Sequence, residues 1–461
     1  MKAGSRAVVL AGLAGCIVQA QDVSLYSTTM AQVWKQETPG FEKSSFAPAT
    51  QFLGIDANRI GTDALSLHLF GWGRADLADQ SGPDGKTSGY LTYGYLEYRF
   101  PQANAEIKAG RFAINQGVGI EQVDGVSARV DLRGGFQVSA FGGRPVWYKT
   151  RDAVSQKDYE FQRDMIAGAR ISLRMPKVGE IGVSYLQDGT TAAKDLPIPS
   201  DVDYSRRQVG VDLRIAPAAV FEFSGRTVFD VASHPAVLAG HPTPSKIAEH
   251  DYNVVVKAAE QLTITGAYVE RNFFAFFAGT NLPSLFRQDE RDKFKSSAGS
   301  VAWGSVASIQ VTADFKHTQR ESYGATNRIG ADLRWAMDGL KLRSGFGFHK
   351  VSADDVLLVD SVHPSYSLSH SQMRAWVMYD KGKLSASVDG ILFAFDDKKN
   401  PNLNGQSSLY ELVGSLGYQA TPNLKVSGDL SYGANSLAKK EVMGLLRAEY
   451  RFTTTSKGGA K

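Results

Sequence analysis

The chain has 461 residues, of which 43% are hydrophobic and 21% are charged, so it is too apolar for an intrinsically disordered protein. After the first twenty residues, no apolar run approaches the roughly 18 residues that a membrane-spanning helix needs, so any crossing of a membrane would use strands. The net charge of +4 comes without a basic block, which excludes a typical nucleic-acid-binding protein.

The start of the chain has the pattern of an export signal. Residues 1–6 carry positive charge, residues 7–18 are apolar, and a small-residue cleavage site ends at Ala20. We therefore expect residues 1–20 to be a cleaved signal peptide and the mature chain to begin at Gln21. The competing interpretation is a lipoprotein signal, because the residues before Cys16 resemble a lipobox. Cys16 is the only cysteine, so a chain that begins at Gln21 has no disulfide, thiol nucleophile or thiolate metal ligand.

Beyond residue 21 the sequence consists of short segments in which apolar and polar residues alternate. In residues 308–316, Ile, Val, Ala and Phe share one face, and Ser, Gln, Thr, Asp and Lys share the other. The same alternation recurs in residues 208–214, 328–334 and 425–431. A period of two is typical of strands, and no segment shows a sustained helical period, so the sequence predicts an all-β fold.

The connections between these segments fall into two classes. Ten short turns are rich in Gly, Pro, Asp and Asn, as tight hairpins require, and eleven longer polar segments alternate with them throughout. This pattern predicts 22 strands, within an acceptable range of 16 to 22, over residues 21–452. A soluble sandwich or propeller would show the same alternation of residues, but alternating short and long connections favour a single closed antiparallel transmembrane β-barrel, with short periplasmic turns and long extracellular loops.

The end of the chain carries a family resemblance. Residues 450–452 read Tyr-Arg-Phe, and this aromatic ending resembles the terminal strand of Gram-negative outer-membrane proteins, although a polar tail of residues 453–461 follows it. With the export signal and the repeated hairpins, the mature chain is similar to porin-type outer-membrane β-barrels over nearly its whole length. The resemblance implies export to the bacterial outer membrane and contact with its lipid. It does not identify a substrate.

In such a barrel the apolar face of each strand contacts lipid and the polar face lines the lumen, because a charge facing hydrocarbon costs about 2–4 kcal/mol at mid-depth. Basic residues outnumber acidic ones among the positions that this rule turns inward. The predicted lumen-facing residues are Arg129, Asp131, Arg170, Asp212, Glu222, Arg226, Asp314, Lys316, Arg328, Asp332 and Arg343.

A second regularity lies just before the short turns, where strands end in an arginine flanked by bulky or apolar residues. The six arginines are Arg99, Arg133, Arg174, Arg214, Arg334 and Arg451. They are expected at one height near the periplasmic mouth, where a ring of positive charge would favour anionic solutes or an acidic partner. The simpler interpretation is that each arginine pairs with a carboxylate on a neighbouring strand, such as Glu106 or Glu180, or anchors the barrel at the headgroups.

One aromatic run enters a predicted outer loop, where it either folds inward as a constriction or packs within its own loop. The run contains Phe273, Phe274, Phe276 and Phe277. No dinucleotide, phosphate-loop or zinc-protease motif occurs, none of the eight histidines has ligand spacing to a carboxylate, and no haem-attachment motif is present. We therefore predict no catalytic residue, no metal site and no cofactor held by this chain, and we do not expect an enzyme.

Two interpretations of function lead, and a third, a structural or adhesive barrel, would predict little conductance. A barrel of 22 strands would have a backbone diameter of roughly 44 Å, and no plug domain precedes the first predicted strand, so something must narrow the lumen. In a porin-like channel, inward loops and charged walls would select small hydrophilic, anionic solutes for passive diffusion. The alternative resembles the barrel subunit of porin–cytochrome conduits, whose lumen holds a multihaem cytochrome, and haem would then be present only through that partner.

Overall fold

The computed structural model describes residues 20–36, 44–78, 86–146, 165–189, 206–231, 247–272, 293–320, 324–356, 366–397, 403, 405–435 and 440–455. Within them, 22 strands form one closed wall, which confirms the all-β class and the predicted strand number. The wall strands are β1 (Ala20–Gln36), β3 (Pro48–Ile60), β4 (Leu65–Asp76), β5 (Thr87–Phe100), β6 (Ala105–Gln116), β7 (Gly119–Asp131), β8 (Phe136–Pro145), β9 (Met165–Met175), β10 (Gly179–Gly189), β11 (Arg206–Ala218), β12 (Phe221–Asp230), β13 (Ile247–Ala259), β14 (Leu262–Asn272), β15 (Lys293–Gly304), β16 (Ile309–Arg320), β17 (Gly324–Met337), β18 (Leu342–Ala353), β21 (His370–Lys381), β22 (Leu384–Phe395), β23 (Ser408–Thr421), β24 (Leu424–Ala434) and β25 (Glu441–Thr455).

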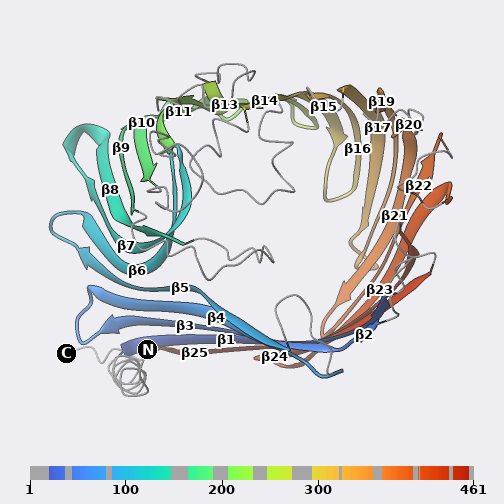
Figure 1. Cartoon of the computed structure of the whole chain (residues 1–461), viewed down its shortest axis with the longest axis horizontal. Coiled ribbons are helices and arrows are strands. Elements are labelled where there is room, and N and C mark those ends of the chain that lie inside the picture. The colour runs from blue at the N-terminus through green and yellow to red at the C-terminus, as the bar shows by residue number, and fades with distance from the viewer. Residues whose placement is uncertain are drawn as a thin grey trace, which may run out of the picture.

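The wall closes where the last strand pairs with the first. Each wall strand pairs antiparallel with its neighbours in sequence, and β25 pairs with β1 from Asp22 opposite Thr455 to Trp34 opposite Met443. Figure 1 shows the resulting ring, with β1 and β25 side by side along its lower wall. The short strand β2 (Ser44–Phe46) pairs with the end of β1, and β19 (Asp355–Val356) pairs with β20 (Tyr366–Ser367) as a separate two-stranded sheet.

Helical structure is nearly absent from the described residues. It includes one 3-10 turn, η1 (Arg133–Gly135), in the connection between β7 and β8. No helix in this part of the chain has the length and apolar character needed to cross a membrane.

The connections between wall strands confirm one sequence prediction and correct another. All ten predicted short turns join the strand pairs expected of them, from β3–β4 to β23–β24. The alternation of short with long connections is wrong at two places on the opposite rim, however. β6 and β7 are separated only by Gly117 and Val118, and β16 and β17 only by residues 321–323. The first of these tight connections shapes the lumen.

The two ends of the wall extend slightly beyond the boundaries predicted from sequence. β25 continues through Thr453 and Thr454 to Thr455, so the first residues of the predicted polar tail belong to the strand. β1 begins at Ala20, which lies opposite Ile60 on β3. Residues 1–19 of the predicted signal peptide, and residues 456–461 of the tail, lie outside the described residues.

Each wall strand has one apolar face and one largely polar face. Directly opposed residues in an antiparallel pair point to the same side of the sheet, so Arg129 on β7, Ser139 on β8 and Arg170 on β9 share a face. The other face exposes large apolar side chains around the ring, as at Ile171, which is 56% exposed, and Leu430, which is 61% exposed. A soluble protein would bury such a continuous apolar surface, so this face is the lipid-contacting one.

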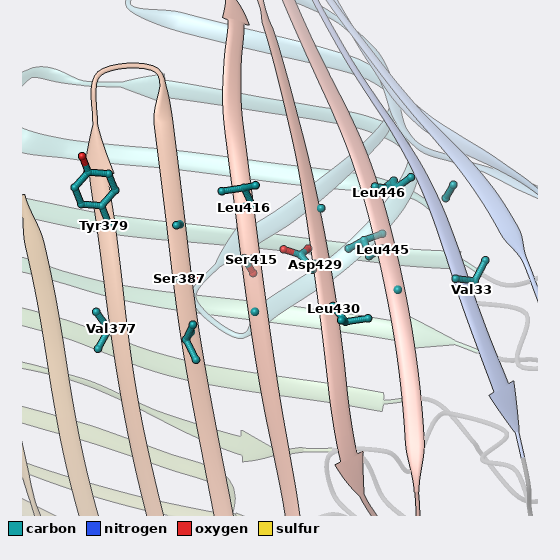
Figure 2. Close-up of a pocket in the computed structure, with 16 residues that line it drawn as sticks. Val33, Val377, Tyr379, Ser387, Ser415, Leu416, Asp429, Leu430, Leu445 and Leu446 are labelled. Atoms are coloured by element: carbon teal, nitrogen blue, oxygen red, sulfur yellow. The ribbon is translucent and has the colours of Figure 1, made fainter.

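The apolar face carries one shallow groove, of about 670 Å3, across β21–β25 and β1. Figure 2 shows its apolar side chains, such as Val377, Leu416 and Leu430, with strands of the opposite wall behind them. Gly414, Gly428 and other small residues form its floor. The groove therefore lies on the outside of the barrel and is not a lumen site.

Candidate functional site: the lumen and its inward hairpin

β6 and β7 begin as wall strands and end as a hairpin that has left the wall. β6 pairs with β5 only from Ala105 to Arg111, and β7 pairs with β8 only from Val123 to Asp131. Beyond these points the two strands pair with each other up to Gln116 opposite Gly119. The last contacts with the adjoining wall are at Gln122, whose carbonyl oxygen accepts from the Val146 N–H and whose side chain contacts Tyr90 and Thr92 of β5. We call residues 112–122 the inward hairpin.

The tip of the inward hairpin lies against the polar face of strands farther along the wall. The backbone N–H of Val118 donates a hydrogen bond to Ser184 Oγ on β10 at 3.0 Å, and Arg226 Nη1 on β12 lies 3.5 Å from the Gly117 carbonyl oxygen. Ser139 on β8 donates to the side chain of Gln116. A hairpin rooted between β5 and β8 reaches β10 and β12 on their polar face only from within the ring. The polar face is thus the lumen face.

An apolar cluster fixes the inward hairpin to the wall. Phe112, Ile114 and Val118 from the hairpin are buried, with exposures of 2% to 8%, among inward side chains of the wall. Phe112 also meets the ring of Tyr95 on β5 edge to face, with the centroids 6.4 Å apart. Each buried side chain of this size stabilises the folded state by about 1.5–3 kcal/mol. The other members of the cluster are Val123, Ile166, Leu186, Val228, Ala248 and Phe141.

Glycines allow the hairpin to turn away from the wall. Gly110 on β6 has φ +129°, and a β-carbon there would overlap the Gly94 carbonyl oxygen of β5. A β-carbon on Gly125 of β7 would overlap the Gly142 carbonyl oxygen of β8 in the same way. Any larger residue at these positions would push the strands apart. At the tip, Gly117 has φ +58° in a two-residue turn, a conformation that favours glycine.

Ion pairs line the wall beside the hairpin. Arg170 on β9 reaches Asp212 on β11, with Nε 3.1 Å from Oδ1, and Glu180 on β10, with Nη2 2.9 Å from Oε1. Glu249 on β13 is 1% exposed and accepts from two arginines, Arg226 at 2.9 Å and Arg271 at 2.7 Å. A buried carboxylate is tolerable only with such partners. The charges in this part of the wall therefore largely neutralise one another.

The strand register places all eleven predicted lumen residues on the inner face, distributed around the ring. Arg129 lies between Glu106 at 4.0 Å and Asp131 at 3.7 Å, and Glu222 pairs with Arg214 at 2.8 Å. The structure does not bring the eleven together at one point. Asp314, Arg328 and Asp332 form a separate group on β16 and β17, and Lys316 and Arg343 have no carboxylate within 4.0 Å in the described part of the chain.

The six arginines at the short-turn rim divide into two groups. Arg99 pairs with Glu97, Arg174 with Glu180 at 3.3 Å, and Arg214 with Glu222 at 2.8 Å. The other three, Arg133, Arg334 and Arg451, are exposed and have no carboxylate within 4.0 Å among the described residues. Arg174 and Arg214 thus pair with a carboxylate on the neighbouring strand, while the partner of Arg99 lies on its own strand, β5.

A row of aromatic rings occupies the inner face from β1 to β5, where the polar pattern predicts hydrophilic residues. Tyr26 lies 6.1 Å from Phe70 and shares a 2.8 Å hydrogen bond with Tyr93, while Phe70 stacks on Tyr93 at 5.6 Å. Tyr93 in turn lies 6.0 Å from Tyr95, which contacts Phe112 of the hairpin. This row extends the apolar lining beyond the hairpin cluster.

The constriction expected from the sequence involves a different segment, the aromatic run of residues 273–277. Phe273, Phe274, Phe276 and Phe277 lie outside the described residues, so that prediction stays untested. The inward hairpin was missed, although a signal exists. Along β6 the apolar residues change phase across Gly110, from Ile107 on the outer face to Phe112 and Ile114 on the inner face. The contact of His349 with two carboxylates was also missed, because strand pairing creates it.

Comparisons with known proteins agree with this architecture. No protein-family model matches the sequence, and no curated protein does. Among solved structures, the siderophore receptor PirA from Pseudomonas aeruginosa is similar with a TM-score of 0.54 at 11% identity, covering 93% of this chain and 80% of PirA. A variant of the ferric enterobactin receptor PfeA from the same species gives 0.52 at 8% identity, with the same coverages. OccAB4 from Acinetobacter baumannii gives 0.44 at 9% identity, covering 94% and 99%. The first two likenesses show the fold, a large closed antiparallel β-barrel.

Proposed function

We propose that this protein is a bacterial outer-membrane channel for the passive passage of small hydrophilic solutes, with a preference for anions. The observation that carries the proposal is a closed 22-strand wall with a polar inner face, narrowed from within by the inward hairpin. A charged inner wall favours a water-filled path over a packed core.

The inward hairpin supports a selective opening. An unobstructed 22-strand barrel would leave a hole of about 44 Å between backbones. The hairpin projects from the wall between β5 and β8 and covers the inner face as far as β12. Its apolar cluster and hydrogen bonds hold it in place, so it narrows the path as a fixed part of the wall.

The proposed anion preference rests on which charges are neutralised. Along most of the inner wall, arginines lie beside carboxylates, as in the contacts of Arg170 with Asp212 and Glu180. Arg133, Arg334 and Arg451 at the short-turn rim have no such partner among the described residues. Fixed charge at a pore mouth raises the local concentration of the opposite ion. The selectivity is therefore proposed to arise at this rim.

The test is conductance of the purified mature chain in planar lipid bilayers. A channel gives discrete current steps whose size grows with salt concentration. Under a salt gradient, an anion-selective channel gives a reversal potential displaced toward the equilibrium potential of the anion. A reversal potential displaced toward the equilibrium potential of the cation would overturn the proposed anion preference. Absence of current steps from correctly folded protein would overturn the proposal of a channel. Haem absorbance that co-purifies from native membranes in stoichiometric amounts would instead favour the barrel sheath of a cytochrome conduit.

A further inference from the structure

Three potential metal ligands meet on the inner wall far from the inward hairpin. His349 on β18 is 4% exposed, and its Nε2 lies 2.8 Å from Asp314 Oδ2 on β16 and 3.5 Å from Asp332 Oδ2 on β17. One donor atom from each residue lies within 4.8 Å of the others. The wall elsewhere pairs carboxylates with arginine or lysine in most cases, so two carboxylates converging on one buried imidazole are unusual here.

Two glycines make room for this group. A β-carbon on Gly330 of β17 would overlap the imidazole of His349, and a β-carbon on Gly347 of β18 would overlap the carboxylate of Asp332. The imidazole of His349 thus lies over Gly330, and the carboxylate of Asp332 lies over Gly347. Any side chain at either position would displace a donor atom from the group.

We infer that His349, Asp314 and Asp332 form a binding site for one divalent transition-metal ion, with Zn2+ as the reference ion. At the tetrahedral angle of Zn2+, bonds of about 2.0–2.2 Å to nitrogen and oxygen place neighbouring ligand atoms roughly 3.3–3.5 Å apart. The observed separation of 3.5 Å between His349 and Asp332 matches that range, and the 2.8 Å contact of His349 with Asp314 would open by about 0.5 Å to admit the ion. One imidazole with two carboxylates suits Zn2+ and similar ions better than Mg2+ or Ca2+, which prefer six or more oxygens. Asp332 is 44% exposed, which leaves the lumen side open to water as a fourth ligand.

The positive charge of Arg328 lies beside the proposed site and provides a second test of the inference. Its Nη1 lies 2.9 Å from Asp314 Oδ1, the carboxylate oxygen that faces away from His349, while Oδ2 faces the imidazole. A guanidinium beside a ligand carboxylate withdraws charge from it and repels a cation. Removing this positive charge should therefore strengthen metal binding, the reverse of what removing a ligand does.

The test is calorimetric titration of Zn2+ into the detergent-solubilised full barrel, with Co2+ absorption as a second readout of the ligands. We expect one saturable site, whose affinity falls by at least about tenfold in His349→Gln and in Asp332→Asn and rises in Arg328→Gln. His68→Gln is the matched control, since His68 contacts a single carboxylate, Asp56, at 2.6 Å, and it should leave binding unchanged. Heat-dependent electrophoretic mobility confirms that each variant has folded.

The outcomes separate this site from the channel proposal, because binding is read without any current. Absence of a saturable site in the wild-type barrel would overturn the inference. So would unchanged affinity in His349→Gln, or a loss in His68→Gln as large as the loss in His349→Gln. A Co2+ spectrum that is the same in wild type and His349→Gln would exclude the imidazole as a ligand.

Discussion

The wall around the inward hairpin and the wall formed by β16–β18 and β21–β25 are built from the same alternating strands, yet their inner faces differ (Figure 1). Around the hairpin, inward positions hold apolar side chains such as Phe112, Ile166 and Leu186, which pack in a cluster. In the second region, inward positions hold ion pairs, as between Arg374 on β21 and Asp389 on β22. The comparison shows that the inner residues differ with their covering: apolar side chains lie beneath the hairpin, and paired charges lie where no described strand covers the wall.

Removing the hairpin is the most direct test of this difference between the two regions. Replacing residues 112–122 with a two-residue Asn-Gly turn should widen the path and raise single-channel conductance roughly twofold, because the wall outside the hairpin is closed without it. The measurement is step size in planar bilayers at fixed salt.

A flexible Gly/Ser segment of the same length provides the control for this deletion. It keeps the chain length but loses the cluster contacts, so we expect a larger and noisier conductance than wild type. An unchanged step size in both variants would show that the hairpin does not narrow the path.

A second variant tests whether the cluster holds the hairpin. Phe112→Ala should lower the free energy of unfolding by about 3–5 kcal/mol, the usual cost of emptying a buried aromatic site. Urea unfolding in lipid vesicles measures it. Phe315→Ala on β16 is the matched control, because Phe315 is 46% exposed on the outer face and leaves no cavity within protein. Equal losses in the two variants would argue against a packed cluster in the lumen.

The difference between the two regions also explains which features sequence could predict. Within the second region, β16–β18 follow the alternation rule, so the inward positions of Asp314, Arg328 and Arg343 can be assigned from period two alone. The hairpin breaks the rule, because its covering is supplied by residues distant in sequence, such as Ser184 and Arg226. Its tight turn looks in sequence like a strand interrupted by glycines.

Pairing across strands sets a second limit on prediction. Whether Arg214 at the rim has a partner depends on the register that brings Glu222 within 2.8 Å, and a shift of one residue would remove that contact. The same holds for His349, which is seventeen residues from Asp332 in sequence and meets it through the β17–β18 register. Residue types identify candidates, but the register decides which of them meet.

A third variant tests whether the unpaired rim arginines set the ion selectivity. Replacing Arg133, Arg334 and Arg451 together with Gln removes three positive charges that lack carboxylate partners in the described part of the chain. The reversal potential in a salt gradient should move toward the cation side, with a larger shift at low salt, because salt screens fixed charges. A reversal potential identical to that of the wild type would exclude these arginines as the source of selectivity.

The control for this triple variant removes a pair without changing net charge. Arg214→Gln with Glu222→Gln deletes one rim arginine together with its carboxylate partner. We expect the reversal potential of this double variant to match that of the wild type. A shift as large as that of the triple variant would mean that paired and unpaired arginines act alike, and the distinction between them would fail.

The smallest expected effect concerns the single hydrogen bond at the hairpin tip. Ser184→Ala removes the acceptor of the Val118 N–H, which lies 3.0 Å from Ser184 Oγ in a buried setting. Leaving a buried N–H without a partner costs about 1–3 kcal/mol, while the Phe112 cluster stays intact. Hydrogen exchange at the Val118 amide should therefore accelerate, with little change in the free energy of global unfolding.

Ser300→Ala on β15 is the control. It removes a 2.6 Å contact with Thr265 on the inner wall away from the hairpin and should leave exchange at Val118 unaltered. If Ser184→Ala leaves that exchange unaltered as well, the tip does not rest on β10, and the inward position of the hairpin depends on the apolar cluster alone.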